Sequence, residues 1–335
     1  MTSLSFPPSQ LLRPALLAAA AWLAASSAVA QSAASYPNRP VRIIVGFPAG
    51  TGPDIVARLL GQKLSETWGG QGVVIDNKPG AGGIIAASEA ARAPADGYTL
   101  MLGETGQLAI APSSYRRLPY DPQADFTPVS QVVTSDFVLL ANPQKTPART
   151  GREDVAWTQK QSKGLFLATF GAGTPGHFGA YMFGDAVGQK PEAVHYKSTA
   201  DALSGLFSGD VSGVFATVGL AAPNVKAGKL VALGSTGATR SPSLPDVPTI
   251  KEQGYPALEF TAWFGIVAPS KTPPDIVRKL SADIVRAVQS DDGRQKLLDA
   301  GFRATGTSPE EFARTIAADT ATWGKAVAAT GFKAD

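Results

Sequence analysis

A buried strand, a glycine-bearing turn and a helix start follow one another directly near the beginning of this 335-residue chain. Residues 41–47 are apolar and β-branched enough for a parallel strand, and Gly50 and Gly52 permit a tight turn. Apolar residues at helical spacing begin at Ile55. Backbone N–H groups point out of such a helix start, and the helix dipole favours negative charge there. The segment therefore predicts a seat for a carboxylate or phosphate that needs no basic side chain.

Strand patterns alternate with helical patterns along most of the chain. Strands are expected at residues 41–47, 72–76, 99–103, 164–170, 193–196, 211–215 and 230–235, and helices at residues 54–66, 83–91, 151–161, 176–187, 200–208, 220–227, 274–289, 293–300 and 309–328. Alternation of this kind predicts an α/β fold with mostly parallel sheets.

Two extended segments, residues 126–142 and 260–268, stand outside this alternation, and each adjoins a proline-rich stretch. We expect them to cross between two lobes, because roughly 305 residues exceed the size at which one core usually keeps growing. The predicted division places residues 31–140 and 261–335 in lobe 1 and residues 141–260 in lobe 2. Two crossings suit hinge closure over a small ligand.

The first thirty residues have the pattern of a secretory signal peptide. Arg13 precedes an apolar run at residues 15–25, and Ala28-Val29-Ala30 follows, so cleavage is expected near Ala30. The run of about eleven residues is too short to span a bilayer core of about 30 Å. Because the chain contains no cysteine, neither a disulfide framework nor a lipid-bearing cysteine after the signal is available.

Charge and composition argue against nucleic-acid binding and against catalysis. The formal net charge is only +3, and no long run of Lys and Arg with interleaved aromatic residues occurs. The only histidines are His177 and His195, which leaves little material for a metal cluster or a nucleophile with its base. No G-x-S-x-G sequence is present either. We therefore expect no cofactor, no metal and no enzyme activity.

Residues 171–176 match G-x-G-x-x-G after a predicted strand. A dinucleotide site also needs an acidic residue at the end of the next strand, whereas Glu192 precedes that strand. We therefore expect an anion-binding turn with Gly171, Gly173 and Thr174, and not a nucleotide site. His177 can either donate a hydrogen bond to a bound anion or pack in the helix start, and the sequence leaves both open.

Two more turns follow predicted strands, where ligands collect in open α/β sheets. In the first, Thr105 can bond a ligand, whereas Glu104 would repel an anion and is expected to point away. The second contains Ala216 and Thr217. Trp263 and Phe264 in the return crossing either line the cleft or pack the hinge, and packing is favoured.

Motifs along the whole chain beyond the leader resemble the Bug receptors, the periplasmic solute-binding proteins of tripartite tricarboxylate transporters. The matching segments are YPNRPVRIIV at residues 36–45, DIVAR at 54–58, NKPGAGG at 77–83, DGYTL at 96–100, LPYDP at 118–122, AGKL at 227–230, RSPSLPDVPT at 240–249 and WFG at 263–265.

The resemblance implies a two-lobed periplasmic binding protein of the type II, Venus-flytrap kind, with two strand crossings and turns from both lobes that grip a carboxylate. Carried onto this chain, the ligand-binding residues are Phe47, Ala49, Gly50, Thr51, Gly52, Pro53, Asp54, Thr105, Gly106, Gly171, Gly173, Thr174, His177, Ala216 and Thr217. The chain departs from the family pattern at Thr51, Pro53, Ala216 and Ser198. Ala216 stands where an aspartate often occurs, which argues against an α-amino acid ligand.

The leading hypothesis is a monomeric receptor in the periplasm that closes over a small organic acid and delivers it to membrane transport subunits. An orphan or sensory receptor that presents its ligand to a membrane sensor is the second hypothesis. An exported hydrolase or lyase is the third, and the scarcity of histidines opposes it.

Overall fold

The computed structural model describes residues 35–160 and 164–335, and residues 39–335 form the compact unit described below. The predicted signal peptide, its cleavage point near Ala30 and the predicted helix end at Gln161 lie outside the described residues. Within the described ranges, no helix is both long enough and apolar enough to cross a membrane.

Five strands form the first region of the sheet, in the order β2-β1-β3-β9-β4. β1 (Val41–Val45) pairs in parallel with β2 (Val73–Asn77) and β3 (Thr99–Glu104). β9 (Thr261–Pro269) lies antiparallel between β3 and β4 (Phe126–Ala141). Only Arg42 of β1 is partly exposed, as is typical of a parallel strand that helices cover on both faces.

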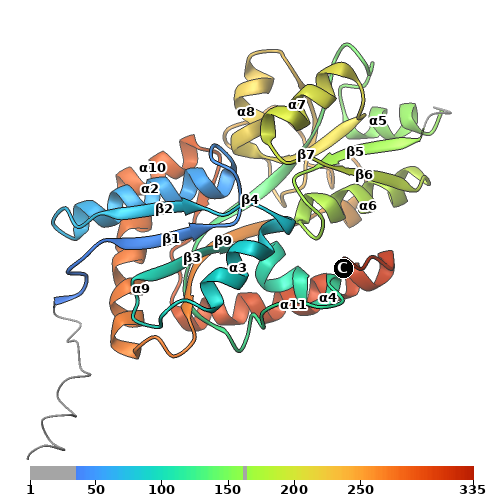
Figure 1. Cartoon of the computed structure of the whole chain (residues 1–335). Helices are drawn as coiled ribbons and strands as arrows, with labels where there is room; N and C mark the ends of the chain where they lie inside the picture. Colours follow the sequence, from blue (N-terminus) through green and yellow to red (C-terminus); the bar gives the residue numbers. More distant parts are fainter. Residues whose placement is uncertain (1–34, 161–163) are drawn as a thin grey trace, which may run out of the picture. The chain divides into compact units, whose positions relative to one another are not determined.

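β4 runs through both regions of the sheet (Figure 1). Its residues 126–136 pair with β9, and residues 137–141 pair with β7 (Gly213–Thr217) and β8 (Val231–Ser235). The segment expected as a crossing is therefore one long strand, and the expected return crossing is β9. Both strands pair antiparallel with their neighbours, so the sheet is mixed, and parallel pairing is confined to strands joined by helices.

The second region continues in the order β7-β5-β6. β5 (Leu165–Thr169) pairs in parallel with β7 and with β6 (Pro191–His195). Its helices are α5 (Gly151–Thr158), α6 (Pro175–Val187), α7 (Thr199–Ser208) and α8 (Val218–Lys226). The hydroxyl of Thr174 caps the start of α6, and the hydroxyl of Ser198 caps the start of α7.

The first region carries five longer helices, which are α2 (Gly52–Thr67), α3 (Ile84–Ala91), α9 (Pro274–Gln289), α10 (Asp291–Asp299) and α11 (Pro309–Thr330). α9 buries Ile276, Leu280 and Ile284, which recur every fourth residue and form the apolar stripe that packs on the sheet and on α2. Ser308 and Glu311 form a capping box that fixes the start of α11.

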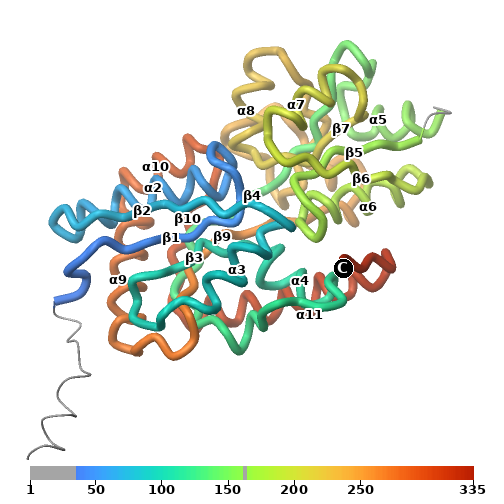
Figure 2. Tube along the Cα trace, in the orientation of Figure 1, coloured from blue at the N-terminus to red at the C-terminus, as the bar shows by residue number. Residues whose placement is uncertain are grey.

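The longest helical segment that was not predicted follows β3. A π-helical turn, η4 (Gly106–Ile110), leads directly from β3 into the short helix α4 (Ala111–Ser114), and α11 packs along both (Figure 2). Gly106 and Pro112 break the helical pattern of the sequence here, so tertiary packing decides the local structure. Three smaller elements were also missed: η3 (Ala81–Gly83), η5 (Pro256–Leu258) and β10 (Arg303–Ala304).

Candidate functional site

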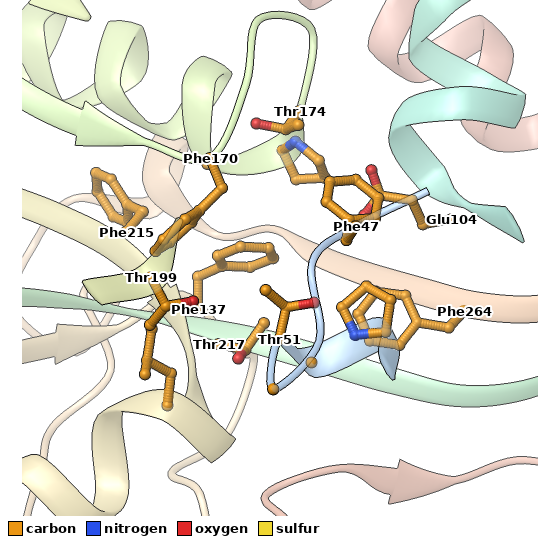
Figure 3. Close-up of a pocket in the computed structure, with 16 residues that line it drawn as sticks. Phe47, Thr51, Glu104, Phe137, Phe170, Thr174, Thr199, Phe215, Thr217 and Phe264 are labelled. Carbon is orange, nitrogen blue, oxygen red and sulfur yellow. The ribbon is translucent and has the colours of Figure 1, made fainter. Parts of the chain in front are cut away.

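A pocket lies where strand ends and helix starts of both sheet regions meet (Figure 3). It encloses about 600 Å³, including the space at its open side. Five phenylalanines and four threonines dominate its wall. The lining residues are Phe47, Gly50, Thr51, Gly52, Pro53, Glu104, Phe137, Phe170, Thr174, Pro175, Gly176, Thr199, Phe215, Thr217, Leu220 and Phe264. No Lys or Arg is among these sixteen described residues.

The turn between β1 and α2 is held in shape by the buried carboxylate of Asp54. This carboxylate accepts hydrogen bonds from the Gly50 N–H at 2.9 Å, from Asn77 Nδ2 at 2.9 Å and from Arg58 Nε at 2.9 Å. Burial favours the neutral acid, but the bonds from Arg58, Gly50 and Asn77 outweigh it and lower the pKa of Asp54. The ionised side chain thus fixes the turn from behind and does not line the pocket.

Thr51 is the N-cap of α2, but its hydroxyl donates to the carbonyl of Pro48 at 2.6 Å and caps no helical N–H. The first N–H groups of a helix have no partner within the helix. Because Gly52 and Pro53 line the pocket, the start of α2 faces this space. The arrangement leaves the positive end of the helix dipole available to a ligand.

The turn before α6 is held by a different side chain. His177 is buried, and its Nδ1 accepts a hydrogen bond from the Gly173 N–H at 3.1 Å. Burial, with a smaller contribution from His195, lowers the pKa of His177 to about 3, so the ring is neutral at physiological pH. Thr174 donates to the carbonyl of Gly171 at 2.8 Å and lines the pocket with Pro175 and Gly176.

Glu104 lines the pocket, and the expectation that its side chain points away is wrong. That expectation assumed an ionised carboxylate. The residue is only 5% exposed, and burial raises the pKa of Glu104 to about 8. A buried carboxyl group without a basic partner retains its proton, so it does not repel an anion as a carboxylate would.

Thr105 and Gly106 do not line the pocket. The Thr105 hydroxyl accepts a hydrogen bond from the Trp263 N–H at 2.9 Å and so joins the end of β3 to β9. Trp263 packs against Phe312 and donates through Nε1 to Asp319, as favoured from the sequence, whereas its neighbour Phe264 lines the pocket.

The end of β7 contributes Thr217 to the pocket, while Ala216 pairs with Val138 of β4 and is buried in the sheet. Sequence reasoning missed Phe137, Phe170, Thr199 and Leu220. It placed Pro175, Gly176 and Phe215 within candidate turns but did not name them as ligand-binding residues. The signal for Phe170 and Phe215 was their place beside the carboxyl ends of β5 and β7, where ligands collect.

The predicted site residues thus fall into two groups. Phe47, Gly50, Thr51, Gly52, Pro53, Thr174 and Thr217 line the pocket. Ala49, Asp54, Thr105, Gly106, Gly171, Gly173, His177 and Ala216 lie outside its lining, and several of them hold the lining turns in place. Their direct contact with a ligand stays a prediction.

Comparison with known proteins gives the family. The model of the tripartite tricarboxylate transporter family receptor matches residues 56–332. The chain belongs to this receptor family. The resemblance to Bug receptors drawn from the sequence is confirmed, because protein BugT of Bordetella pertussis is 32% identical over 303 residues, 90% of this chain and 92% of BugT. The family and its fold are those of periplasmic solute-binding receptors, which are not enzymes.

Two solved structures of the receptor type come from Rhodopseudomonas palustris. Rpa4515 with adipate is 34% identical, has a TM-score of 0.85, and aligns over 89% of this chain and 99% of its own. MatC with bound malate is 32% identical, has a TM-score of 0.81, and aligns over 87% of this chain and 100% of its own. The similarity confirms the two-lobed α/β fold of periplasmic binding proteins.

Proposed function

We propose that this chain is a periplasmic receptor that captures a small organic acid between two lobes. One observation carries the proposal: the starts of α2 and α6, on different regions of the sheet, border the same pocket. Two helix N-termini supply N–H groups and positive dipole ends that stabilise a carboxylate without a basic side chain. The absence of Lys and Arg from the described lining fits this mode of binding.

The relatives support an acid as the ligand. Rpa4515 is described with adipate and MatC with malate, and both acids carry carboxylate groups. The same class of ligand suits the present pocket, with the Thr217 hydroxyl as a further hydrogen-bond donor in its wall. The hydroxyls of Thr51 and Thr174 already donate to Pro48 and Gly171 and shape the two turns.

Capture proceeds by closure of the lobes. We assign residues 31–140 and 261–335 to one lobe and residues 141–260 to the other. β4 changes its partners between Asp136 and Phe137, and Phe260, just before β9, bonds Thr236, so the two connections lie close to these boundaries. Ligand contacts from both lobes shift the population toward the closed state.

The receptor acts in the periplasm after removal of the signal peptide near Ala30. It works as a monomer, without cofactor or chemical conversion of the ligand, and it delivers the acid to membrane transport subunits. Delivery to a membrane sensor is the alternative for the same binding event.

A thermal-shift screen of the chain without residues 1–30 tests the proposal. Mono-, di- and tricarboxylates, aromatic acids, amino acids and neutral sugars are compared at equal concentration, and hits are measured by calorimetry. We expect a rise in Tm with at least one carboxylate, since a ligand bound only by the folded state stabilises it. A rise only with sugars or amino acids contradicts the proposal.

A further inference from the structure

The pocket wall contains one acidic side chain that the carboxylate proposal does not explain. Glu104 is the last residue of β3, opposite Phe264 of β9, and both residues line the pocket. Its backbone N–H donates to Gln107 Oε1 at 3.0 Å, which fixes the chain at this point. The side-chain Oε1 is buried and has no hydrogen-bond partner among the residues that the structure describes. A buried polar atom without a partner costs free energy, so its presence in a binding pocket calls for a ligand that completes it.

The neighbouring backbone makes room for this carboxyl group. A Cβ atom at Gly106 would come within 2.5 Å of Glu104 Oε1 and within 3.4 Å of the Gly173 carbonyl. Only glycine therefore lets the Glu104 side chain lie beside η4 without displacement. Gly106 then contributes to the site by leaving space, although it does not line the pocket.

Among the described residues that line the pocket, no Lys or Arg stands beside Glu104 to neutralise its ionised form. Arg42 of β1 pairs with Glu89 of α3, and Asp54 of α2 pairs with Arg58. The phenol of Tyr120 interacts with Glu104, and burial raises the pKa of Tyr120, so this group stays neutral and supplies no positive charge. Burial lowers the pKa of His177 in the α6 turn, so that ring is neutral as well. β9 carries no ionisable side chain. Burial without a cationic partner raises the pKa of Glu104 to about 8.

The rest of the wall is apolar. Phe47, Phe137, Phe170, Phe215 and Phe264 surround the space with Pro53, Pro175 and Leu220. Such a wall stabilises an apolar or aromatic ligand body by burial and ring contacts. It offers no positive side chain for a second carboxylate, and burying an unpaired charge is costly.

We infer that the ligand is a monocarboxylate with an aromatic or bulky apolar body, and that neutral Glu104 donates a hydrogen bond to a ligand oxygen. Glu104 is then a specificity-determining residue. Its O–H donates to a ligand oxygen, and the site disfavours a second negative charge that has no hydrogen-bond donor. This inference rests on the proposed function, because the helix starts of α2 and α6 hold the ligand's carboxylate.

The test compares benzoate and phenylacetate with terephthalate, adipate, malate and phenylalanine, by calorimetry on the chain without residues 1–30. We expect benzoate or phenylacetate to bind more tightly than the diacids. We expect E104Q to bind within about threefold of the wild type, because an amide N–H replaces the acid O–H as donor. E104L, which keeps side-chain bulk without a donor, should lose about 10- to 100-fold.

The pH profile separates a neutral acid from an ionised one. Affinity of the wild type for the monoacid should be level from pH 6 to 7 and fall above about pH 8, by up to tenfold per unit, as Glu104 loses its proton. E104Q should give a level profile. E259Q is the matched control, since Glu259 pairs with Lys251 at 2.8 Å and lies outside the pocket lining. It should keep the wild-type fall.

Several outcomes overturn the inference. Tighter binding of the monoacid above pH 8, or a loss of its binding in E104Q equal to that in E104L, would show that Glu104 does not act as a hydrogen-bond donor to the ligand. Tighter binding of phenylalanine than of either monoacid would mean that ionised Glu104 holds an ammonium group. Stronger binding of a diacid than of either monoacid also contradicts it. If carboxylates bind but the Glu104 variants change nothing, only this inference fails. If no carboxylate binds to a folded protein, the proposed function fails and this inference fails with it.

The variant G106A provides a second test that leaves Glu104 itself unchanged. It should displace the Glu104 carboxyl group and weaken binding of the monoacid, while G106A in an E104L background should add little. Melting temperatures without ligand show whether each variant is folded. Equal losses in both backgrounds would place the effect of Gly106 elsewhere.

Discussion

The carboxylate of Asp54 accepts a hydrogen bond from the N–H of Gly50 at 2.9 Å, across the turn that connects β1 to α2. Gly50 has a φ of +79°, a conformation that glycine adopts without strain. Arg58, one helical turn later, binds both oxygens of the same carboxylate. The pocket turn is thus set by a side chain that lies outside the pocket, which makes ligand affinity sensitive to a residue with no ligand contact.

Asp54→Asn should therefore weaken both the fold and ligand binding. The amide has one acceptor oxygen where the carboxylate has two. It therefore cannot accept all of the hydrogen bonds that Gly50, Arg58 and Asn77 donate to Asp54. We expect a loss of about 2 kcal/mol in the free energy of unfolding, measured from urea unfolding at pH 7. Because the pKa of Asp54 is lowered on folding, its stabilisation is present above the unfolded pKa of 3.8 and is lost as the pH falls through the folded value.

D275N is the control for this change, since Asp275 pairs with Arg278 where both side chains are about 70% exposed. Exposed ion pairs contribute about 0.5 kcal/mol or less. Equal losses in D54N and D275N would contradict the assigned role of Asp54.

Thr174→Val should reduce ligand affinity at a modest cost in stability. The threonine hydroxyl bonds the Gly171 carbonyl and caps α6, and the same side chain lines the pocket. Loss of an N-cap costs about 1 kcal/mol. Ser308→Ala removes the cap of α11, away from the pocket, and should cost a similar amount without any change in affinity. An equal loss of affinity in both variants would show that general destabilisation, and not the α6 turn, is responsible.

The order and type of most elements could be predicted from the sequence because they depend on local patterns. The β1 turn and α2 are specified by a run of β-branched residues, two glycines and the apolar spacing after Ile55. The long strand β4 was expected only as an extended crossing, since its burial on both sides gives no alternation that marks a strand.

The composition of the pocket could not be predicted in the same way. Its five phenylalanines come from the β1 turn, β4, the end of β5, β7 and β9, and only the sheet order brings them together. The direction of Glu104 depends on the pleat of β3 and on the π-helical turn that follows it. Its protonation depends on burial, which no local sequence pattern reports.

His177→Asn should flatten the acid limb of the stability curve. The pKa of His177 is about 3 in the folded protein against an ordinary value of 6.5, because burial and, to a smaller extent, His195 disfavour the charged ring. Stability from this group is therefore complete above pH 6.5 and falls as the pH drops toward 3, by up to about 1.4 kcal/mol per unit.

The asparagine side-chain oxygen can take the place of Nδ1 and accept from Gly173 without titrating. The difference in unfolding free energy between wild type and H177N should thus change steadily from pH 6.5 to pH 4. A constant difference over this range would show that His177 is not held neutral.

Glu104→Gln should change the stability curve in the opposite direction. Burial raises the pKa of Glu104 from its ordinary value of 4.5 to about 8, so the folded state binds this proton more tightly than the unfolded state. Stability from this group therefore falls as the pH rises from about 4.5 to about 8, by up to about 1.4 kcal/mol per unit. The glutamine does not titrate, so urea unfolding of E104Q at pH 5, 6, 7 and 8 should show a smaller decline than the wild type.

Asp154 is a second buried acid, and burial raises its pKa to about 7, so it also makes stability fall as the pH rises. E104Q keeps this contribution from Asp154, whereas the double variant E104Q/D154N should lose it. If wild type and E104Q decline in parallel, Glu104 is already ionised in the empty pocket at neutral pH.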